Sequence, residues 1–154
     1  MANILQNRLA IFDLDGTLVD VTNIRHYVEG KKKNFDLFHK ESINCPPNEK
    51  VLFLNRTLAM TQDIYIAIFT GREEKYRGLS EQWLDDNKVS YHCLLMRQDN
   101  DFRSNVTIKN ELFENFKFNY LPYLAIDDTP ELRKLWGQVG FLNIYDPLNF
   151  NHQS

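Results

Sequence analysis

Residues 9–17, LAIFDLDGT, constrain what this chain can fold into more than any other stretch. Four apolar residues lead directly to Asp13 and Asp15, and Gly16 and Thr17 then close a turn. An apolar run without alternation is typical of a strand covered on both faces, as in a parallel sheet between helices. Ligands of such sheets bind just beyond the carboxyl ends of the strands, where we expect both acids to lie.

Two carboxylates one residue apart need a reason to coexist. At ~4 Å and an effective dielectric constant of ~20, their repulsion is on the order of 4 kcal/mol. A bound cation or a catalytic role explains the pair. The structural alternative is that Asp13 caps a helix or turn and that Asp15 with Gly16 forms a plain turn. This stretch alone leaves both interpretations open.

The length and composition of the chain are those of a single globular domain, which we expect to span residues 1–154. A net charge of −3 gives no overall basic signature, so contact with nucleic acid must depend on a local patch. No apolar run approaches the ~20 residues of a membrane span, and the N-terminus lacks the pattern of a signal peptide. These absences, together with a count of only two cysteines, predict a cytoplasmic protein without a disulfide framework.

Apolar periodicity predicts that helices and strands alternate along the chain. We expect helices over 49–62, 73–86, 105–116 and 130–139, strands over 64–70, 89–96, 123–126 and 142–145, and a polar tail over 149–154. Such alternation favours an α/β three-layer sandwich around a mainly parallel sheet. The polar, mixed segment 19–48 interrupts the pattern, and we expect it to form a small insertion over the mouth of the sheet.

Polar side chains follow the last apolar residue of three predicted strands. They are Asp13, Asp15, Thr70, Asp127 and Asp128. Because the carboxyl ends of parallel strands share one edge of a sheet, we expect these side chains to meet there. Each also has an ordinary explanation, since Thr70 can close a turn and the last acid pair can cap the helix that follows. Only their joint pattern favours a site.

In order along the chain, four motifs resemble those of the haloacid dehalogenase (HAD) superfamily of phosphotransferases. They are DLDGT at 13–17, Thr70 after a strand, Lys109 near a helix start, and Asp127-Asp128. The likeness covers most of the chain and implies a Rossmann-like HAD fold with a small cap insertion over about 19–48. A receiver domain also carries acids, a threonine and a lysine, but in a different order.

The second half of the chain is similar to the 3′-phosphatase domain of bacteriophage polynucleotide kinase/phosphatase and to related stand-alone phage phosphatases. The likeness lies in TGR at 70–72, LLMRQDNDFRSNVTIKNEL at 94–112 and LAIDDTPELRKLWGQVG at 124–140. The chain has no Gly-x4-Gly-Lys-Ser/Thr loop, so we expect no kinase half.

The resemblance implies a role for each motif. Asp13 is the expected nucleophile that forms an aspartyl-phosphate, and Asp15 is the general acid and base, for which its pKa must be raised. Thr70 and nearby backbone N–H groups are expected to bind phosphate oxygens, while Lys109 neutralises charge. The remaining expected substrate-binding residues are Gly71, Arg72, Arg97 and Arg103. For the arginines, ordinary ion pairing is the alternative.

The resemblance also implies a metal site. Its expected ligands are the Asp13 carboxylate, the Asp15 carbonyl and Asp128, with Asp127 holding a metal-bound water or orienting its neighbour. A charge count supports a cation, because a phosphate dianion with Asp13 and Asp128 sums to about −4. Mg²⁺ and Lys109 together supply a charge of +3, which offsets most of this negative charge. The sequence has no cluster of His and Cys with the spacing of zinc ligands, so we predict Mg²⁺ rather than zinc.

An insertion of about thirty residues is too small for a large cap domain, so we expect an open site that suits a long substrate. The sequence therefore predicts a 3′-phosphatase acting on DNA or RNA ends, with arginines contacting backbone phosphates. Lys31–Lys33 can add a phosphate contact or form a solvated loop.

Two alternatives stay open. One is a 5′(3′)-nucleotidase or general small-molecule phosphatase, with Phe35, Phe38 and His39 forming a base pocket. The other is a non-catalytic nucleotide or nucleic-acid binder on the same fold.

Overall fold

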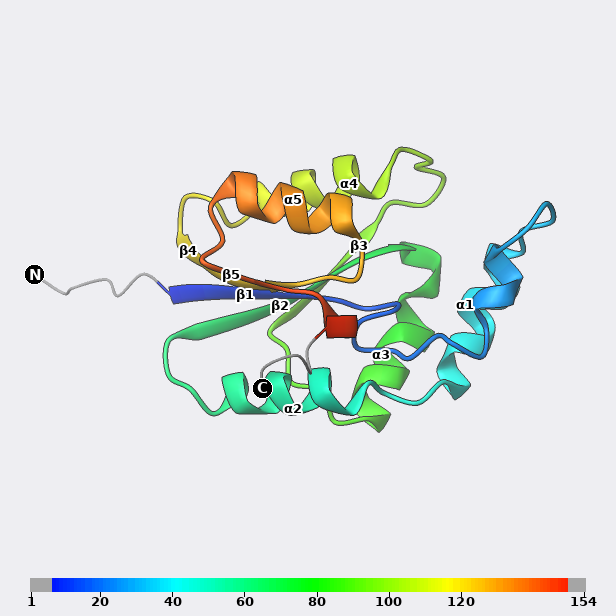
Figure 1. Cartoon of the computed structure of the whole chain (residues 1–154), viewed down its shortest axis with the longest axis horizontal. Coiled ribbons are helices and arrows are strands. Elements are labelled where there is room, and N and C mark those ends of the chain that lie inside the picture. Colours follow the sequence, from blue (N-terminus) through cyan, green and yellow to red (C-terminus); the bar gives the residue numbers. More distant parts are fainter. Residues whose placement is uncertain (1–6, 150–154) are drawn as a thin grey trace, which may run out of the picture.

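A computed structural model describes residues 7–149, so the expected polar tail lies almost wholly outside the described residues. Its centre is a five-stranded sheet in the order β3-β2-β1-β4-β5, and every neighbouring pair is parallel (Figure 1). The strands are β1 Asn7–Asp13, β2 Ile64–Glu73, β3 Cys93–Arg97, β4 Tyr120–Ile126 and β5 Asn143–Tyr145.

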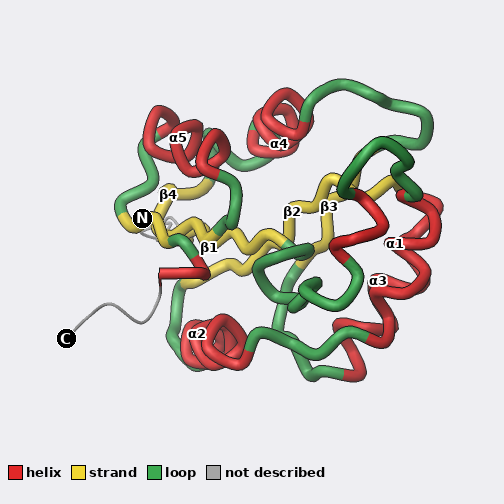
Figure 2. Tube along the Cα trace, turned by 45° about the vertical axis from the view of Figure 1, so that its right-hand side comes forward, coloured by secondary structure: helices red, strands yellow, loops and turns green. Residues whose placement is uncertain are grey.

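Helices cover both faces of this sheet. They are α1 Phe35–Glu41, α2 Glu49–Ala59, α3 Arg77–Asp86, α4 Asn105–Phe113 and α5 Pro130–Val139. Figure 2 shows α4 and α5 on one side of the strands and α2 and α3 on the other. The α/β three-layer sandwich with a parallel central sheet is therefore confirmed. Among the described residues, no helix is long and apolar enough to cross a membrane.

The opening apolar run packs in both directions, as its lack of alternation predicts. Ala10 and Phe12 belong to the apolar cluster that includes residues of α2 and α3, whereas Leu9 and Ile11 belong to the cluster with α4 and α5. All four side chains are buried. Burying each large apolar side chain contributes about 1.5–3 kcal/mol, so β1 anchors both halves of the core.

Several element boundaries differ from the predicted ones. The strand expected from Val89 begins only at Cys93, because the Val89 N–H bonds to the Leu84 carbonyl in the turn after α3. Ser104, rather than Asn105, caps α4, since its Oγ accepts a bond from the Thr107 N–H. β2 continues past Thr70 to Glu73 instead of ending at the threonine.

The register of the sheet places the polar strand ends side by side. Phe12 of β1 is paired with Ile126, the last residue of β4. Asp13 therefore lies level with Asp127, which directly follows β4. On the other side Asp13 is paired with Phe69, one residue before Thr70. Strand pairing alone thus brings three of the predicted polar positions to one edge.

The segment between β1 and α2 lies at this same edge. It contains the short 3-10 helices Arg25–Val28 and Ser42–Asn44, which flank α1. Figure 1 shows α1 at the carboxyl end of β1. Phe38 of α1 is buried in the core, and the Tyr76 hydroxyl donates to the Asp36 carboxylate at 2.8 Å. These contacts hold α1 against the residues that precede α3.

Candidate active site

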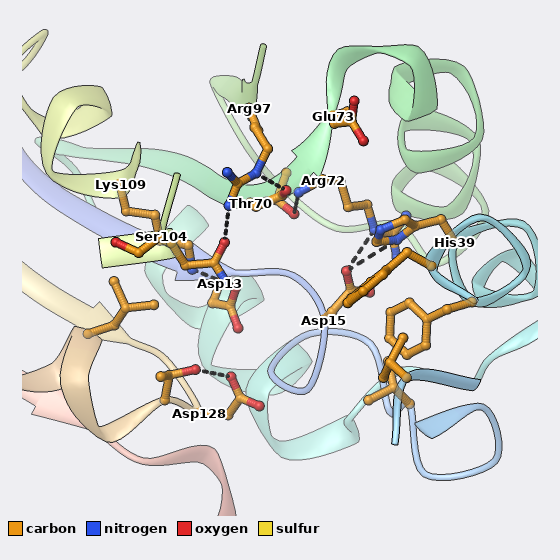
Figure 3. A pocket seen from close by; sticks show the side chains of 18 of the residues that line it. Asp13, Asp15, His39, Thr70, Arg72, Glu73, Arg97, Ser104, Lys109 and Asp128 are labelled. Atoms are coloured by element: carbon orange, nitrogen blue, oxygen red, sulfur yellow. Dashed lines mark hydrogen bonds and ion pairs between the residues drawn. The ribbon is translucent and has the colours of Figure 1, made fainter. Parts of the chain in front are cut away.

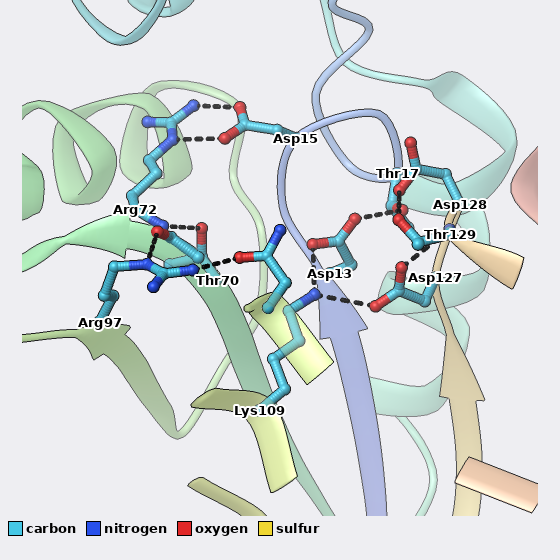
Figure 4. A network of polar contacts seen from close by, with 12 residues as sticks. Asp13, Asp15, Thr17, Thr70, Arg72, Arg97, Lys109, Asp127, Asp128 and Thr129 are labelled. Atoms are coloured by element: carbon cyan, nitrogen blue, oxygen red, sulfur yellow. Dashed lines mark hydrogen bonds and ion pairs between the residues drawn. The ribbon is translucent and has the colours of Figure 1, made fainter. Parts of the chain in front are cut away.

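A buried lysine joins two of the strand-end acids. Lys109 lies in the second turn of α4, and its ammonium donates to Asp13 at 2.7 Å and to Asp127 at 2.8 Å (Figure 4). The Lys109 side chain is 3% exposed and those of Asp13 and Asp127 are 9% and 2% exposed. A residue 96 positions away in the sequence thus contacts the end of the first strand.

This centre has more negative than positive charge. Burial raises the pKa of Asp13 well above its usual value, and repulsion from Asp127 adds to it, although Lys109 acts in the opposite direction. Burial also raises the pKa of Asp128, again with repulsion from Asp127. The pKa of Lys109 is raised despite its burial, because Asp13 and Asp127 stabilise the ammonium. The one ammonium of Lys109 therefore offsets only part of the negative charge of these neighbouring carboxylates.

The donor set fits a hard divalent cation. Carboxylate oxygens of Asp13, Asp127 and Asp128 lie within 4.8 Å of one another. Oxygen ligands of this kind are those that Mg²⁺ and Ca²⁺ bind in proteins. Both carboxylate oxygens of Asp127 already accept hydrogen bonds, one from Lys109 and one from the Thr129 N–H. These contacts hold the Asp127 carboxylate in a fixed orientation between Lys109 and the start of α5.

Gly16 and Thr17 shape the site in ways that the sequence reasoning missed, since it assigned them only to a turn. The Thr17 hydroxyl donates to Asp13 Oδ2 at 2.8 Å and is completely buried. Gly16 has φ +81°, and a Cβ there would lie 2.2 Å from Asp128 Oδ2. Only glycine lets the backbone of this loop approach Asp128 so closely. The Asp-Gly-Thr sequence at 15–17 was the feature from which the Thr17–Asp13 bond and the close approach of Gly16 to Asp128 could have been predicted.

Asp15 faces away from Asp13 and pairs with Arg72 (Figure 4). Two parallel bonds join them, Nε to Oδ2 at 2.8 Å and Nη2 to Oδ1 at 2.5 Å, and Arg72 also donates to the Ser80 hydroxyl. Burial alone would raise the pKa of Asp15, but the guanidinium offsets this and holds that pKa below its usual value. The raised pKa expected for a general acid is therefore absent from this conformation.

Thr70, Gly71 and Arg97 form a linked group beside Asp13. The buried Thr70 hydroxyl accepts a bond from the Arg72 N–H at 3.2 Å. Arg97 donates to the Gly71 carbonyl and to Asn105 Oδ1. A Cβ at Gly71 would lie 2.3 Å from Asn105 Oδ1, so this position needs glycine for close approach rather than for a turn.

Arg103, like Arg72, is a predicted substrate-binding residue whose charge is already balanced by carboxylates. It is half exposed and forms ion pairs with Asp101 and Glu111. The predicted Arg97, in contrast, contacts no carboxylate within residues 7–149 and instead donates to carbonyl and amide oxygens. Lys31–Lys33 are exposed and lie outside the lining of the central cavity.

A cavity of about 660 Å³ opens above these groups (Figure 3). Its wall includes Asp13, Asp15, Thr70, Gly71, Arg72, Arg97, Arg103, Lys109 and Asp128. Phe35, Phe38 and His39 also line it, as the alternative base pocket requires. Burial lowers the pKa of His39 to about 4, although Asp15 opposes that shift, so this imidazole is neutral near pH 7.

The comparisons with known proteins identify the family of the chain. The family model described as "Polynucleotide kinase PNKP phosphatase domain" matches residues 7–144. A chain of the Pnkp1/Rnl/Hen1 RNA repair complex is 26% identical over 92% of this chain, with a TM-score of 0.77. This chain spans only 42% of that one, and 46% of a similar chain in a second Pnkp1/Rnl/Hen1 structure.

The HAD-like hydrolase SP0104 from Streptococcus pneumoniae has the same fold. It is 11% identical, with a TM-score of 0.59 over 96% of this chain and 92% of its own. No significant match was found among curated protein sequences.

The family model over residues 7–144 places the chain among phosphatase domains of the haloacid dehalogenase type. More narrowly, the chain belongs to the family of polynucleotide kinase PNKP phosphatase domains. Phosphatases of the HAD class use a divalent metal, and the Asp13, Asp127 and Asp128 cluster provides suitable oxygens.

Proposed function

We propose that this phosphatase removes the 3′-phosphate from DNA or RNA ends, with Mg²⁺ and through an aspartyl-phosphate on Asp13. The observation that carries the proposal is the family match over residues 7–144, because that span includes every residue of the buried centre. The similar chain in an RNA repair complex supports a nucleic-acid end as the substrate.

The segment 19–48 serves as a small cap in this proposal. It contributes Phe35, Phe38 and His39 to one wall of the cavity, and its only α-helix is the seven-residue α1. We expect so small an element to leave the site open to the end of a polymer. A closed lid would admit only a small phosphate ester.

In the first step an Asp13 carboxylate oxygen attacks phosphorus in line, and the bond from phosphorus to the 3′ oxygen breaks. The Lys109 ammonium and the Thr70 hydroxyl stabilise the charge that develops on the phosphoryl oxygens. Asp15 gives a proton to the departing 3′ oxygen. Because Arg72 holds Asp15 ionised in this structure, Asp15 has to leave Arg72 and gain that proton beforehand.

In the second step water attacks phosphorus while Asp15 takes up its proton. The acyl-phosphate bond to Asp13 breaks, and phosphate and the free carboxylate result. Thr17 and Lys109 keep the Asp13 carboxylate in one orientation through both steps, because each of its oxygens has a fixed donor.

Mg²⁺ fits the oxygens of Asp13 and Asp128, and the Asp15 backbone carbonyl is the third ligand that we propose. When bound there, the ion neutralises charge shared by the phosphate and the nucleophile. Asp127 acts by orienting Lys109 and the start of α5.

The test is a comparison of matched substrates in the presence and absence of Mg²⁺. We expect rapid phosphate release from a 3′-phosphorylated oligonucleotide, and little from the same oligonucleotide carrying a 5′-phosphate or from nucleoside monophosphates. Purified Asp13→Asn protein is the control for contaminating phosphatases.

One result would contradict the polynucleotide substrate while leaving the phosphatase intact. If mononucleotides are hydrolysed far faster than oligonucleotide ends, the enzyme is a nucleotidase. Phe35, Phe38 and His39 would then be the base pocket, since all three line the cavity.

A further inference from the structure

Phe102 is a large apolar side chain in an unusual place. It lies in the loop between β3 and α4, is 86% exposed and forms part of the wall of the catalytic cavity. None of the reaction steps above uses it. Within residues 7–149, no other aromatic ring and no cation lies against its face.

The loop that carries this exposed ring is itself firmly held. Arg97 Nη1 donates to the carbonyls of Asp101 and Arg103, the two residues that flank Phe102, at 2.8 Å and 2.5 Å. The Asp101 carboxylate accepts bonds from the Arg103 backbone N–H and guanidinium. An exposed aromatic ring on a fixed backbone loses little conformational entropy when a ligand binds, which favours a contact surface.

Two further bonds tie the loop to the end of β2 and the residues after it. The Asn100 N–H donates to the Glu73 carboxylate at 2.9 Å, and the Lys75 N–H donates to the Asp99 carboxylate at 2.8 Å. Because Thr70 is part of β2, the position of the Phe102 loop is coupled to the predicted phosphate-binding residues.

Two other exposed aromatic residues, Phe53 and Phe118, do not share this setting. Phe53 and Phe118 are 74% and 80% exposed, yet neither lines the cavity. The Lys117 ammonium already lies over the Phe118 ring, 5.0 Å from its centre. These two residues therefore serve as controls for the general effect of an exposed phenylalanine.

The cavity combines a phosphate-binding floor with apolar material at its wall. Asp13, Thr70 and Lys109 line it together with Phe102 and with Phe35, which is 55% exposed at the start of α1. A volume of about 660 Å³ exceeds what a phosphate group alone requires and is typical of sites for ligands as large as a nucleotide. Aromatic side chains beside a phosphate site are the usual means of holding a base of a single strand.

We propose that Phe102 is the stacking platform for the terminal nucleobase of the polynucleotide whose 3′-phosphate enters the site. This inference rests on the proposed 3′-phosphatase function and adds a specificity-determining residue to it. Because every base offers a π-face, the contact selects for the presence of a base and tolerates any sequence. Phe102 positions the substrate and takes no part in bond breaking.

The experiment compares two 3′-phosphorylated oligonucleotides that differ only at the last nucleotide, which carries either a base or an abasic analogue. Wild-type enzyme is measured beside Phe102→Ala, Phe102→Trp and the control Phe118→Ala, all with Mg²⁺. We expect wild-type KM to be about tenfold lower for the end that carries a base. Phe102→Ala should abolish this preference without changing kcat by more than about twofold, whereas Phe102→Trp and Phe118→Ala should keep it.

Each result decides the question. A base preference lost only in Phe102→Ala supports the platform. Equal losses on base-bearing and abasic ends would show that Phe102 merely maintains the loop, and a wild-type enzyme indifferent to the base would also overturn the inference. In both of these cases the 3′-phosphatase function stands. If neither 3′-phosphorylated end is hydrolysed, the proposed function fails first and the platform fails with it.

Discussion

The buried centre and the rim of the cavity are built on opposite principles. At the centre, Asp13, Lys109 and Asp127 are almost fully buried and bonded to one another. At the rim, Phe102 and Arg103 are exposed on a loop held mainly through its backbone and acidic side chains. A buried network has few tolerated variants, because each unpaired charge is costly, whereas an exposed ring can change without unfolding the protein. We therefore expect substitutions at the centre to change the chemical step and substitutions at the rim to change the choice of substrate.

Removing the expected nucleophile should have the largest effect and tests the role of the buried centre most strongly. We expect Asp13→Asn to lower kcat by on the order of 10⁴-fold or more, as the loss of other covalent nucleophiles does. The fold should survive, because the amide keeps the shape of the carboxylate. Phosphate release and thermal unfolding followed by circular dichroism measure the two effects, and substantial remaining turnover would refute the role of Asp13.

Removing the metal should have the next largest effect. We expect a chelator to stop phosphate release and Mg²⁺ to restore it, because a bound cation would offset the repulsion between the clustered carboxylates and the phosphate dianion. Binding should also appear without turnover, as an Mg²⁺-dependent rise in the melting temperature. Asp128→Asn should reduce that rise, and activity unaffected by the chelator would contradict the assignment.

Replacing Lys109 tests how far turnover and stability depend on the ammonium group at the buried centre. Replacement by methionine should lower kcat by about 10²–10³-fold, the usual cost of losing a group that stabilises developing charge. It should also destabilise the fold by about 3 kcal/mol, because two buried carboxylates lose their partner.

The matched control is Lys117→Met, since Lys117 pairs with Glu114 on the surface and should contribute less than about 1 kcal/mol. Chemical denaturation of both variants measures the difference. Equal stabilities would mean that the buried ion pairs do not organise the centre.

Gly71 connects the centre to the rim and should give a smaller, mixed effect. In Gly71→Ala the new Cβ would displace the Asn105 amide, which accepts a bond from Arg97. We expect KM for a 3′-phosphorylated oligonucleotide to rise by about tenfold as the loop shifts, in line with about 1.4 kcal/mol for one charge-assisted bond.

Gly78→Ala is the control for that substitution, because open space surrounds Gly78 in α3. It should leave KM unchanged and stabilise the protein by roughly 0.5 kcal/mol. Steady-state kinetics on both variants would expose an error if Gly71→Ala behaved like Gly78→Ala.

Arg103 should give the smallest effect of all. Its guanidinium is exposed and already paired with Asp101 and Glu111, so little charge remains for the substrate. We expect Arg103→Ala to change kcat/KM less than about threefold, since exposed ion pairs contribute little. A much larger loss would show that Arg103 leaves its acids to bind the substrate.

The sequence predicted the sheet and the meeting of its polar ends because both follow from local rules. Apolar runs specify buried strands, and parallel pairing then brings Asp13, Thr70 and Asp127 to one edge. Lys109 was predicted as a site residue only from the resemblance to a known family. Nothing in its spacing shows that a helix 96 residues further along points back at Asp13.

The hydrogen-bond and ion-pair partners of the side chains could not be predicted from the sequence, because they depend on rotamers and on packing between distant segments. The pairing of Asp15 with Arg72 spans 57 positions and reverses the expected pKa shift of Asp15. The contact of Thr17 with Asp13 and the hold of Arg97 on the Phe102 loop were missed for the same reason. The turn and ion-pair alternatives for these residues were equally consistent with the sequence.

The most direct measurement of the central claim is chemical trapping of the phosphorylated enzyme. The enzyme is mixed with an excess of a 3′-phosphorylated oligonucleotide and Mg²⁺, quenched in acid within milliseconds and reduced with borohydride, which converts an acyl-phosphate to an alcohol. The account predicts homoserine at position 13 in the peptide that contains DLDGT, and none in the Asp13→Asn protein. Turnover in the same sample with an unmodified Asp13, or with homoserine at another aspartate, would contradict it.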